Sequence, residues 1–168
     1  NADQNNQNSL INLARKFTAF RSNEGTYKKT KLEAVIPSLF GVKTMDEVST
    51  IIRVDFIPDE VAFKLPIETF RLANKGDAVA IMIVQEMGRA QGQYAASIVK
   101  HLGMEKEKLP LVLIGSLFGT NNPYLIDPYI DEVRRIAKKA FTIIPNFPPV
   151  KGAYLLAVDA MVGVASSL

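Results

Sequence analysis

The chain has 168 residues, the length of about one domain, and 48% of them are apolar while 22% are charged. This composition is typical of a globular protein with its own core and excludes an intrinsically disordered chain. A net charge of +3 does not indicate a nucleic-acid or anionic-membrane partner. Because the sequence contains no cysteine, it excludes disulfides, thiolate zinc sites and cysteine-ligated clusters within itself.

No segment of the sequence has the pattern of a targeting signal or a membrane span. Residues 1–9 are polar and rich in Asn and Gln, without the basic and apolar regions of a secretory signal. The most apolar segment, 153–164, is interrupted by Asp159 and is shorter than the roughly 18 residues of a spanning helix. We therefore expect a cytoplasmic protein that does not cross a membrane.

Residues 1–75 are predicted to form short helices separated by turns. The first helix has apolar residues at spacings of three and four: Leu10, Leu13, Phe17 and Phe20. A second helical face, 32–39, ends at Gly41. Thr44 with Glu47 then matches a capping box that starts a third helix.

Two prolines and an aspartate predict where helices begin or are interrupted in the next part of the chain. Pro58, followed by two acidic residues, predicts the start of a helix that Pro66 kinks or divides. Asp77 caps the longest predicted helix, which Gly103 ends. Its apolar stripe consists of Val79, Ile83, Met87, Ala90, Tyr94, Ile98 and Leu102. A stripe of small residues predicts close helix-on-sheet packing: Gly88, Gly92 and Ala96.

Two short apolar runs, 109–114 and 141–144, are typical of strands that are covered on both faces. Helices are predicted at 123–139 between them and at 150–164 after them. This order predicts an α/β, helix-rich fold with about two parallel strands and a right-handed crossover. Two parallel strands cannot bury both faces alone, so further strands are expected from elsewhere. We divide the chain into a helical segment, 1–75, and an α/β part, 76–168.

The turn 115–122 between the first strand and the next helix is the best candidate site. Ligands of open α/β sheets bind beyond the carboxyl ends of the strands, and glycine lets them approach the backbone. The alternative is an ordinary turn with a structural glycine. His101 is interpreted as a surface or capping residue, and the acids at 127–132 as partners of a helix dipole. No residue is assigned as catalytic or as a metal ligand.

Three segments together resemble one protein family. L-V-L-I-G-S-L-F-G-T-N-N-P-Y-L-I-D-P at 111–128 resembles the adenosine motif of the BadF/BadG/BcrA/BcrD ATPase and N-acetylglucosamine kinase family. F-P-P-V-K-G-A-Y-L-L-A at 147–157 is similar to its closing element, and G-D-A-V-A at 76–80 to the start of its long helix. The resemblance implies an incomplete ribonuclease H-like lobe of the actin-like ATPase type.

The resemblance also implies ATP as cofactor, with Mg²⁺ in the complete protein. It places Gly115 and Ser116 against the adenosine, while Gly152 seats the last helix nearby. The implied cofactor-binding residues are Gly115, Ser116, Leu117, Phe118, Gly119 and Gly152. Ser116 replaces a frequent second glycine, and Gly119 replaces a frequent lysine, which removes a charge that could meet ATP.

The family's phosphate loops and catalytic aspartate are absent from the sequence. The chain is therefore expected to be the C-terminal half of such a protein, with the upstream half as its partner and no ATP turnover by itself. The function expected is the ATP-binding part of a sugar kinase that phosphorylates an amino sugar. The alternatives are an ATPase activator of a 2-hydroxyacyl-CoA dehydratase or benzoyl-CoA reductase, which the lack of cysteine disfavours, and a non-catalytic binding or assembly module. The open sheet edge also predicts a homo-oligomer or helices folded over that edge.

Overall fold

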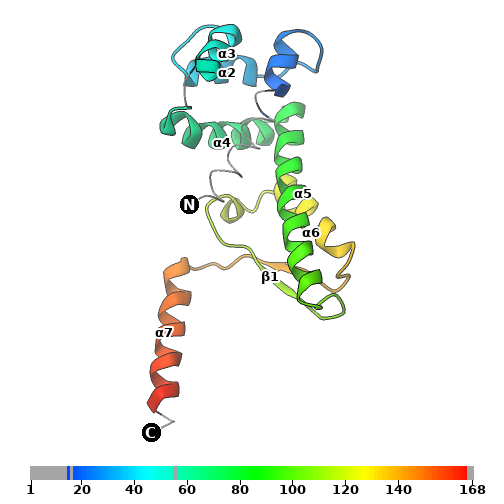
Figure 1. Ribbon diagram of the computed structural model, residues 1–168, viewed down its shortest axis with the longest axis vertical. Helices are drawn as coiled ribbons and strands as arrows, with labels where there is room; N and C mark the ends of the chain where they lie inside the picture. Colours follow the sequence, from blue (N-terminus) through cyan, green and yellow to red (C-terminus); the bar gives the residue numbers. More distant parts are fainter. Residues whose placement is uncertain (1–14, 16, 55–56, 166–168) are drawn as a thin grey trace. The chain divides into compact units, whose positions relative to one another are not determined.

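The computed structural model of the chain describes residue 15 and residues 17–54 and 57–165 (Figure 1). The described part contains seven α-helices, one short 3-10 helix and one sheet of two parallel strands, so the helix-rich α/β expectation is confirmed. The chain forms two compact units, which we call the N-terminal unit, Asn1–Gln91, and the C-terminal unit, Gly92–Leu168. Their boundary lies within one continuous helix, and the division into a helical segment, 1–75, and an α/β part, 76–168, stays a prediction.

The N-terminal unit is entirely helical in its described part. A first helix covers residues 17–23 and is followed by α2 (Leu32–Leu39), α3 (Met45–Val54), α4 (Asp59–Asn74) and the start of α5 (Ala78–His101). Two members of the predicted first helical face, Leu10 and Leu13, lie outside the described residues, and Phe17 is exposed. The core contains Leu32, Ile36, Met45, Val48, Val61, Leu65, Phe70, Leu72, Val79, Ile83, Val84 and Met87.

Local signals set the ends of these helices as the sequence predicts. The Thr44 hydroxyl accepts the Glu47 N–H at 3.2 Å, and the Glu47 carboxylate accepts the Thr44 N–H at 2.9 Å. The Thr44 hydroxyl also donates to the Glu47 carboxylate at 2.9 Å. This bond, together with those from the Lys43 and Thr44 N–H groups, holds the pKa of Glu47 below its ordinary value. After α2, Gly41 adopts φ +70°, a conformation that favours glycine at a helix end. The capping box and the helix end at Gly41 are both confirmed.

Helix α4 begins at Asp59 directly after Pro58, as predicted, but Pro66 does not divide it. Proline removes one backbone hydrogen bond and costs a helix about 3 kcal/mol. Leu65 and Phe70, on either side of the proline, are buried in the core of the unit. Burial of two such side chains is worth about 3–6 kcal/mol, which offsets the cost. Of the two predicted outcomes, a kink or a division, the division does not occur.

The apolar stripe predicted along α5 does not face one core. Its first part, Val79 to Met87, is buried, whereas Tyr94, Ile98 and Leu102 are exposed. In the C-terminal unit the buried side of the helix instead includes Gly92 and Val99. The helix therefore buries different faces in its two parts.

The close approach predicted at Gly92 is present, but the partner is a helix. A Cβ atom at Gly92 would lie 2.4 Å from the Tyr129 carbonyl oxygen and 2.8 Å from the Glu132 Cβ atom. Both residues belong to α6 (Pro123–Arg134), which lies beside α5 in Figure 1. At Gly92 the prediction of helix-on-sheet packing was therefore wrong, since small residues serve helix-on-helix contact equally well.

The two predicted strands form the parallel pair expected from the sequence. Strand β1 (Pro110–Val112) and strand β2 (Phe141–Ile143) align in register, with Leu111 opposite Thr142. Helix α6 connects them and ends at Arg134, so its predicted extension to residue 139 was wrong. Residues 135–139 turn the chain back toward β2, and the Arg134 side chain donates to the Ala140 carbonyl at 3.0 Å. Helix α7 (Pro149–Ala165) follows, as predicted.

Only one face of the sheet is covered in the described chain. Leu113 is 4% exposed and packs in the core with Val99, Ile130 and Val133. On the opposite face, three side chains are largely exposed: Val112 at 52%, Ile114 at 55% and Ile143 at 40%. No described element covers these three side chains, so the predicted cover from strands outside this chain stays a prediction.

Candidate functional site

A cavity of about 490 Å³ lies at the carboxyl ends of the two strands, within the C-terminal unit. One wall is formed by the end of β1 and the turn after it, and the other by the segment from β2 to the first turn of α7. The lining residues are Val112, Leu113, Ile114, Gly115, Ser116, Gly119, Ile144, Pro145, Phe147 and Gly152. Its position agrees with the rule that open α/β sheets bind ligands beyond the carboxyl ends of their strands.

Four of the six residues singled out from the sequence line this cavity together. Gly115, Ser116 and Gly119 come from the turn after β1, and Gly152 comes from α7, more than thirty positions later. Leu117 and Phe118 lie outside the lining. The Phe118 ring instead contacts the Tyr129 ring edge-to-face, with centroids 5.6 Å apart, and so anchors the turn on the core.

The conformation of the turn follows from its residue types. Gly115 has φ +113°, where an L side chain would be strained, and its carbonyl accepts the Gly119 N–H at 2.9 Å. This bond leads into the short 3-10 helix η1 (Phe118–Thr120). Asn122 then caps α6, since its side-chain oxygen accepts the Tyr124 N–H at 2.9 Å. These hydrogen bonds fix the turn that connects the end of β1 to the start of α6.

Sequence reasoning missed the second wall of the cavity, formed by Ile144, Pro145 and Phe147. A usable signal was present, because the carboxyl ends of parallel neighbouring strands lie at the same edge of a sheet. This rule places residues directly after the second apolar run beside the turn after the first, an inference that was not drawn from the sequence. Asn122 was also missed, although an asparagine before a proline at a helix start is a common cap pattern.

The cavity offers apolar contact and backbone groups rather than acid–base chemistry. Six lining residues are apolar side chains, three are glycines, and Ser116 contributes the one side-chain hydroxyl. Such a lining suits a flat, largely uncharged group, with glycines leaving the backbone accessible. No lining side chain is a general acid, a general base or a metal ligand, so this arrangement can bind but supplies no proton transfer.

The other titratable residues considered from the sequence do not gather into a second site. His101 is exposed at the end of α5, and the buried Glu132 pairs with Arg135 at 3.1 Å. Burial raises the pKa of the Tyr129 hydroxyl. In the part of the chain that the structure describes, no group of three or more His, Asp or Glu residues could hold a metal ion.

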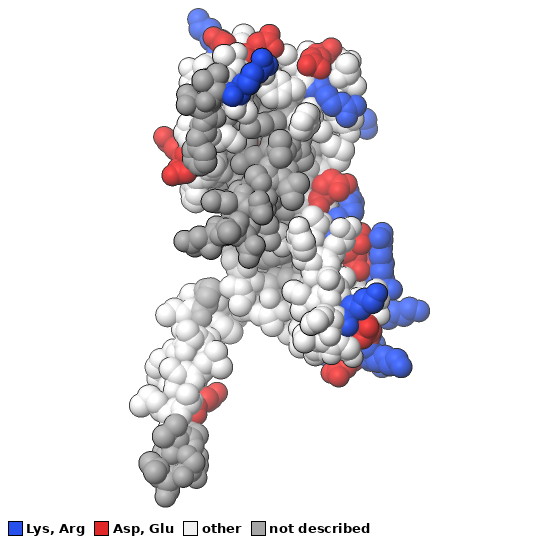
Figure 2. Space-filling model, in the orientation of Figure 1, with Lys and Arg blue, Asp and Glu red and all other residues white. Residues whose placement is uncertain are grey.

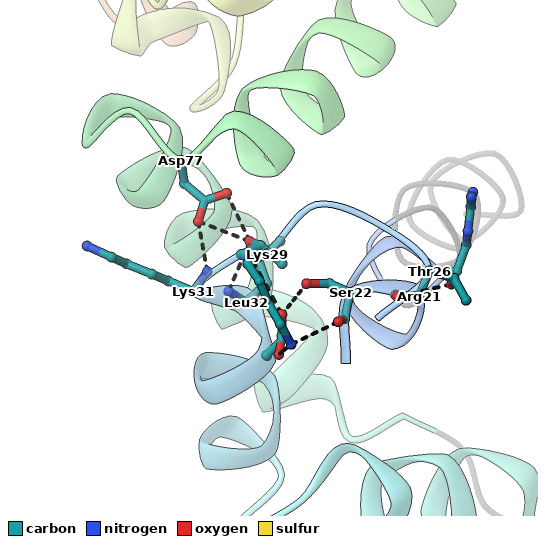
Figure 3. Close-up of polar contacts among 9 residues, drawn as sticks. Arg21, Ser22, Thr26, Lys29, Lys31, Leu32 and Asp77 are labelled. Atoms are coloured by element: carbon teal, nitrogen blue, oxygen red, sulfur yellow. Dashed lines mark hydrogen bonds and ion pairs between the residues drawn. The ribbon is translucent and has the colours of Figure 1, made fainter. Parts of the chain in front are cut away.

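The N-terminal unit contains a polar cluster around two carboxylates (Figure 3). Asp77 accepts the Thr30 hydroxyl at 2.9 Å and the Lys31 N–H at 2.8 Å, and its cap on α5 includes the Ala80 N–H at 3.0 Å. Glu33 accepts hydrogen bonds from Ser22, Lys29 and the Thr30 N–H. Burial by itself raises the pKa of Glu33, but these hydrogen bonds outweigh it and hold the pKa below its ordinary value. The cluster joins α2 to the start of α5, which is a structural role.

None of the helices in the described part of the chain is long and apolar enough to cross a membrane. No protein-family model, no curated protein and no solved structure matches the sequence.

Proposed function

We propose that the cavity at the strand ends binds the adenosine portion of an adenine nucleotide. One observation carries the proposal: Gly115, Ser116, Gly119 and Gly152, chosen from the sequence, line a single cavity of about 490 Å³. That volume lies within the range of small-molecule sites, and the apolar walls suit a purine base. The glycines leave room for the base and ribose beside the backbone.

The larger role follows from the resemblance of segments 76–80, 111–128 and 147–157. We propose that the chain is the ATP-binding C-terminal part of an N-acetylglucosamine kinase-like sugar kinase, with an incomplete ribonuclease H-like fold. ATP with Mg²⁺ would phosphorylate an amino sugar, and the phosphate loops and catalytic base would come from the upstream half. Phosphoryl transfer depends on positioning and on neutralising charge around the phosphates. The lining of this cavity contains no carboxylate for Mg²⁺, so we expect this chain to bind adenine nucleotide without hydrolysing it.

Gly152 provides a test of the cavity that does not disturb the backbone. A Cβ atom there meets nothing within 4 Å, and the residue lies within α7, where leucine is a better helix former than glycine. In Gly152→Leu, the added side chain should occupy the cavity and weaken ATP binding by about tenfold or more, a loss of about 1.4 kcal/mol. Gly115→Val would be less informative, because the positive φ of Gly115 adds strain to any blocking effect.

Ala153→Leu is the matched control, since Ala153 is exposed on the same helix and does not line the cavity. Titration calorimetry with ATP should give the control the affinity of the unaltered chain. Equal losses in both variants, or no ATP binding by the unaltered chain, would overturn the proposed site. The kinase role has its own assay: sugar phosphorylation should appear only when the upstream half is added, and robust turnover by this chain alone would contradict that role.

The uncovered sheet face supports a proposal about partners. Val112, Ile114 and Ile143 form an apolar surface beside an open strand edge, which is a template for association. Val112 and Ile114 also line the cavity, whereas Ile143 does not. We propose that the upstream half of the fold covers the part of this face around Ile143 and that, without it, copies of the chain associate. Light scattering over a concentration series should show self-association that Ile143→Lys reduces. A monodisperse monomer at all concentrations would contradict this proposal.

A further inference from the structure

Lys151 is the one charged residue in the two sequence segments that line the cavity. Segments 112–119 and 144–152 supply every lining residue, and they contain no other Lys or Arg and no Asp, Glu or His. Lys151 also directly precedes Gly152, which is part of the lining. Any ionic preference that these walls impose on a ligand therefore depends on this side chain.

The ammonium group of Lys151 lies over an aromatic ring that lines the cavity. Its Nζ atom lies 5.1 Å from the centroid of the Phe147 ring, and Phe147 lines the cavity. Lys151 itself is exposed. A cation–π contact at an exposed site is weak, whereas a lysine–phosphate hydrogen bond is charge-assisted and stronger. The ammonium can therefore leave the ring for an anionic group at the mouth of the cavity.

The stability of α7 does not account for a lysine at this position. The helix begins at Pro149, so Lys151 lies in its first turn, where the helix dipole disfavours a positive charge. The first turn contains no acidic residue that would offset this charge. Residues that violate a local preference of this kind are expected at functional sites.

We propose that Lys151 makes the cavity selective for a nucleotide over a nucleoside. The apolar walls contact the base and ribose, and the Lys151 ammonium binds the phosphate nearest the ribose. This inference rests on the proposed adenosine site and deepens it, because it assigns the anionic part of the ligand to a residue of this chain. It also predicts a single phosphate contact, so that AMP already has the full preference over adenosine.

AMP and adenosine are the probes that separate the two parts of the ligand. In titration calorimetry, the unaltered chain should bind AMP about tenfold more tightly than adenosine. Lys151→Gln should remove this preference and leave adenosine affinity unchanged, while Lys151→Arg should retain it. Added salt should weaken AMP binding and not adenosine binding, since only the former includes an ion pair with an exposed group.

Lys108 provides the matched control, because its Nζ atom lies 5.8 Å from the centroid of the Phe141 ring, which does not line the cavity. Lys108→Gln removes the same charge and the same kind of ring contact, and it should keep the tenfold preference. Equal affinities for AMP and adenosine in the unaltered chain, or equal losses for both in Lys151→Gln, would overturn the role of Lys151 alone. Failure of both compounds to bind would overturn the adenosine site and the role of Lys151 together.

Discussion

The two units differ in how much of their apolar side-chain surface is buried within the described chain. In the N-terminal unit, helices α2 to α4 contribute to one buried core, although Phe63 and Ile67 of α4 are exposed. The carboxylates of Glu33 and Asp77 are hydrogen-bonded to neighbouring segments. In the C-terminal unit, one sheet face is uncovered and α7 exposes Leu156 and Met161. Figure 2 shows that uncharged side chains cover most of α7 on the visible face.

This difference follows from geometry. A helix has one apolar side to bury, so a few helices can complete a core among themselves. A parallel sheet has two apolar faces and needs layers on both. The C-terminal unit therefore combines a cavity with unsatisfied apolar surface, which are the features through which a chain meets ligands and partners. The N-terminal unit has the features of a stable support.

The largest effect is expected from a charge placed on the covered face of the sheet. Leu113→Lys buries an ammonium group among Val99, Ile130 and Val133, which should destabilise the C-terminal unit by about 4 kcal/mol or more. Ile143→Lys places the same charge on the uncovered face and should change stability by about 0.5 kcal/mol or less. Urea denaturation of both variants measures the difference. Similar losses would mean that both faces are covered in solution.

A smaller effect is expected where two helices touch. Gly92→Ala forces a methyl group against the Tyr129 carbonyl oxygen, so α5 and α6 must separate, at a cost of about 2 kcal/mol. Gly152→Ala, in open space on α7, should instead stabilise the chain by up to about 1 kcal/mol. Thermal unfolding of the pair tests the contact. A stabilised Gly92→Ala variant would show that the helices do not approach this closely.

Within the N-terminal unit, Asp77→Ala should cost about 2 kcal/mol. The substitution removes the cap of α5 and leaves the Thr30 hydroxyl and the Lys31 N–H without their carboxylate partner. Asp59→Ala, which also removes an acid next to a helix start, should cost about 0.5 kcal/mol through the helix dipole alone. Chemical denaturation followed by circular dichroism distinguishes them. Equal costs would remove the special role of the cluster in Figure 3.

The smallest effect concerns pH. The pKa of Glu33 is below its ordinary value of 4.5 in the folded chain, so its ionised form stabilises the fold above pH 4.5. This stabilisation is lost as the pH falls through the folded pKa. Glu33→Gln should therefore cost about 1 kcal/mol at pH 7 and progressively less below pH 4.5. Denaturation midpoints of both proteins over this range measure it. A difference that does not change with pH would contradict the hydrogen-bonded carboxylate.

Helix ends and the two strands could be predicted because their signals are local. The Thr44–Glu47 box, the Asp77 cap and the break at Gly103 each depend on residues within one turn of the helix. The change from helical spacing to continuous apolar runs located both strands. The turn after β1 was also predictable, since Gly115 follows a buried run and precedes a helix.

The mistaken predictions concern what each element packs against. The continuity of α4 through Pro66 depends on burial of its neighbours, and the exposure of Tyr94 depends on where α6 lies. The sequence shows that Val112 is apolar but not which element would cover it. To predict the second wall of the cavity, the two apolar runs had to be paired as neighbouring strands, because Phe147 follows the second of them. Local patterns thus predict elements well, whereas partners across space depend on tertiary contacts.

The adenosine site is tested most directly by observing the glycines of both units during nucleotide binding. The chain contains ten glycines, so a sample with ¹⁵N-labelled glycine gives one amide signal for each in a two-dimensional NMR spectrum. On titration with ADP, the signals of Gly115, Gly119 and Gly152 should shift together and saturate, because these residues line the cavity. The signals of Gly25 and Gly41, in the N-terminal unit, should remain in place. Saturating shifts confined to the N-terminal unit, or no shifts at millimolar ADP, would contradict the account.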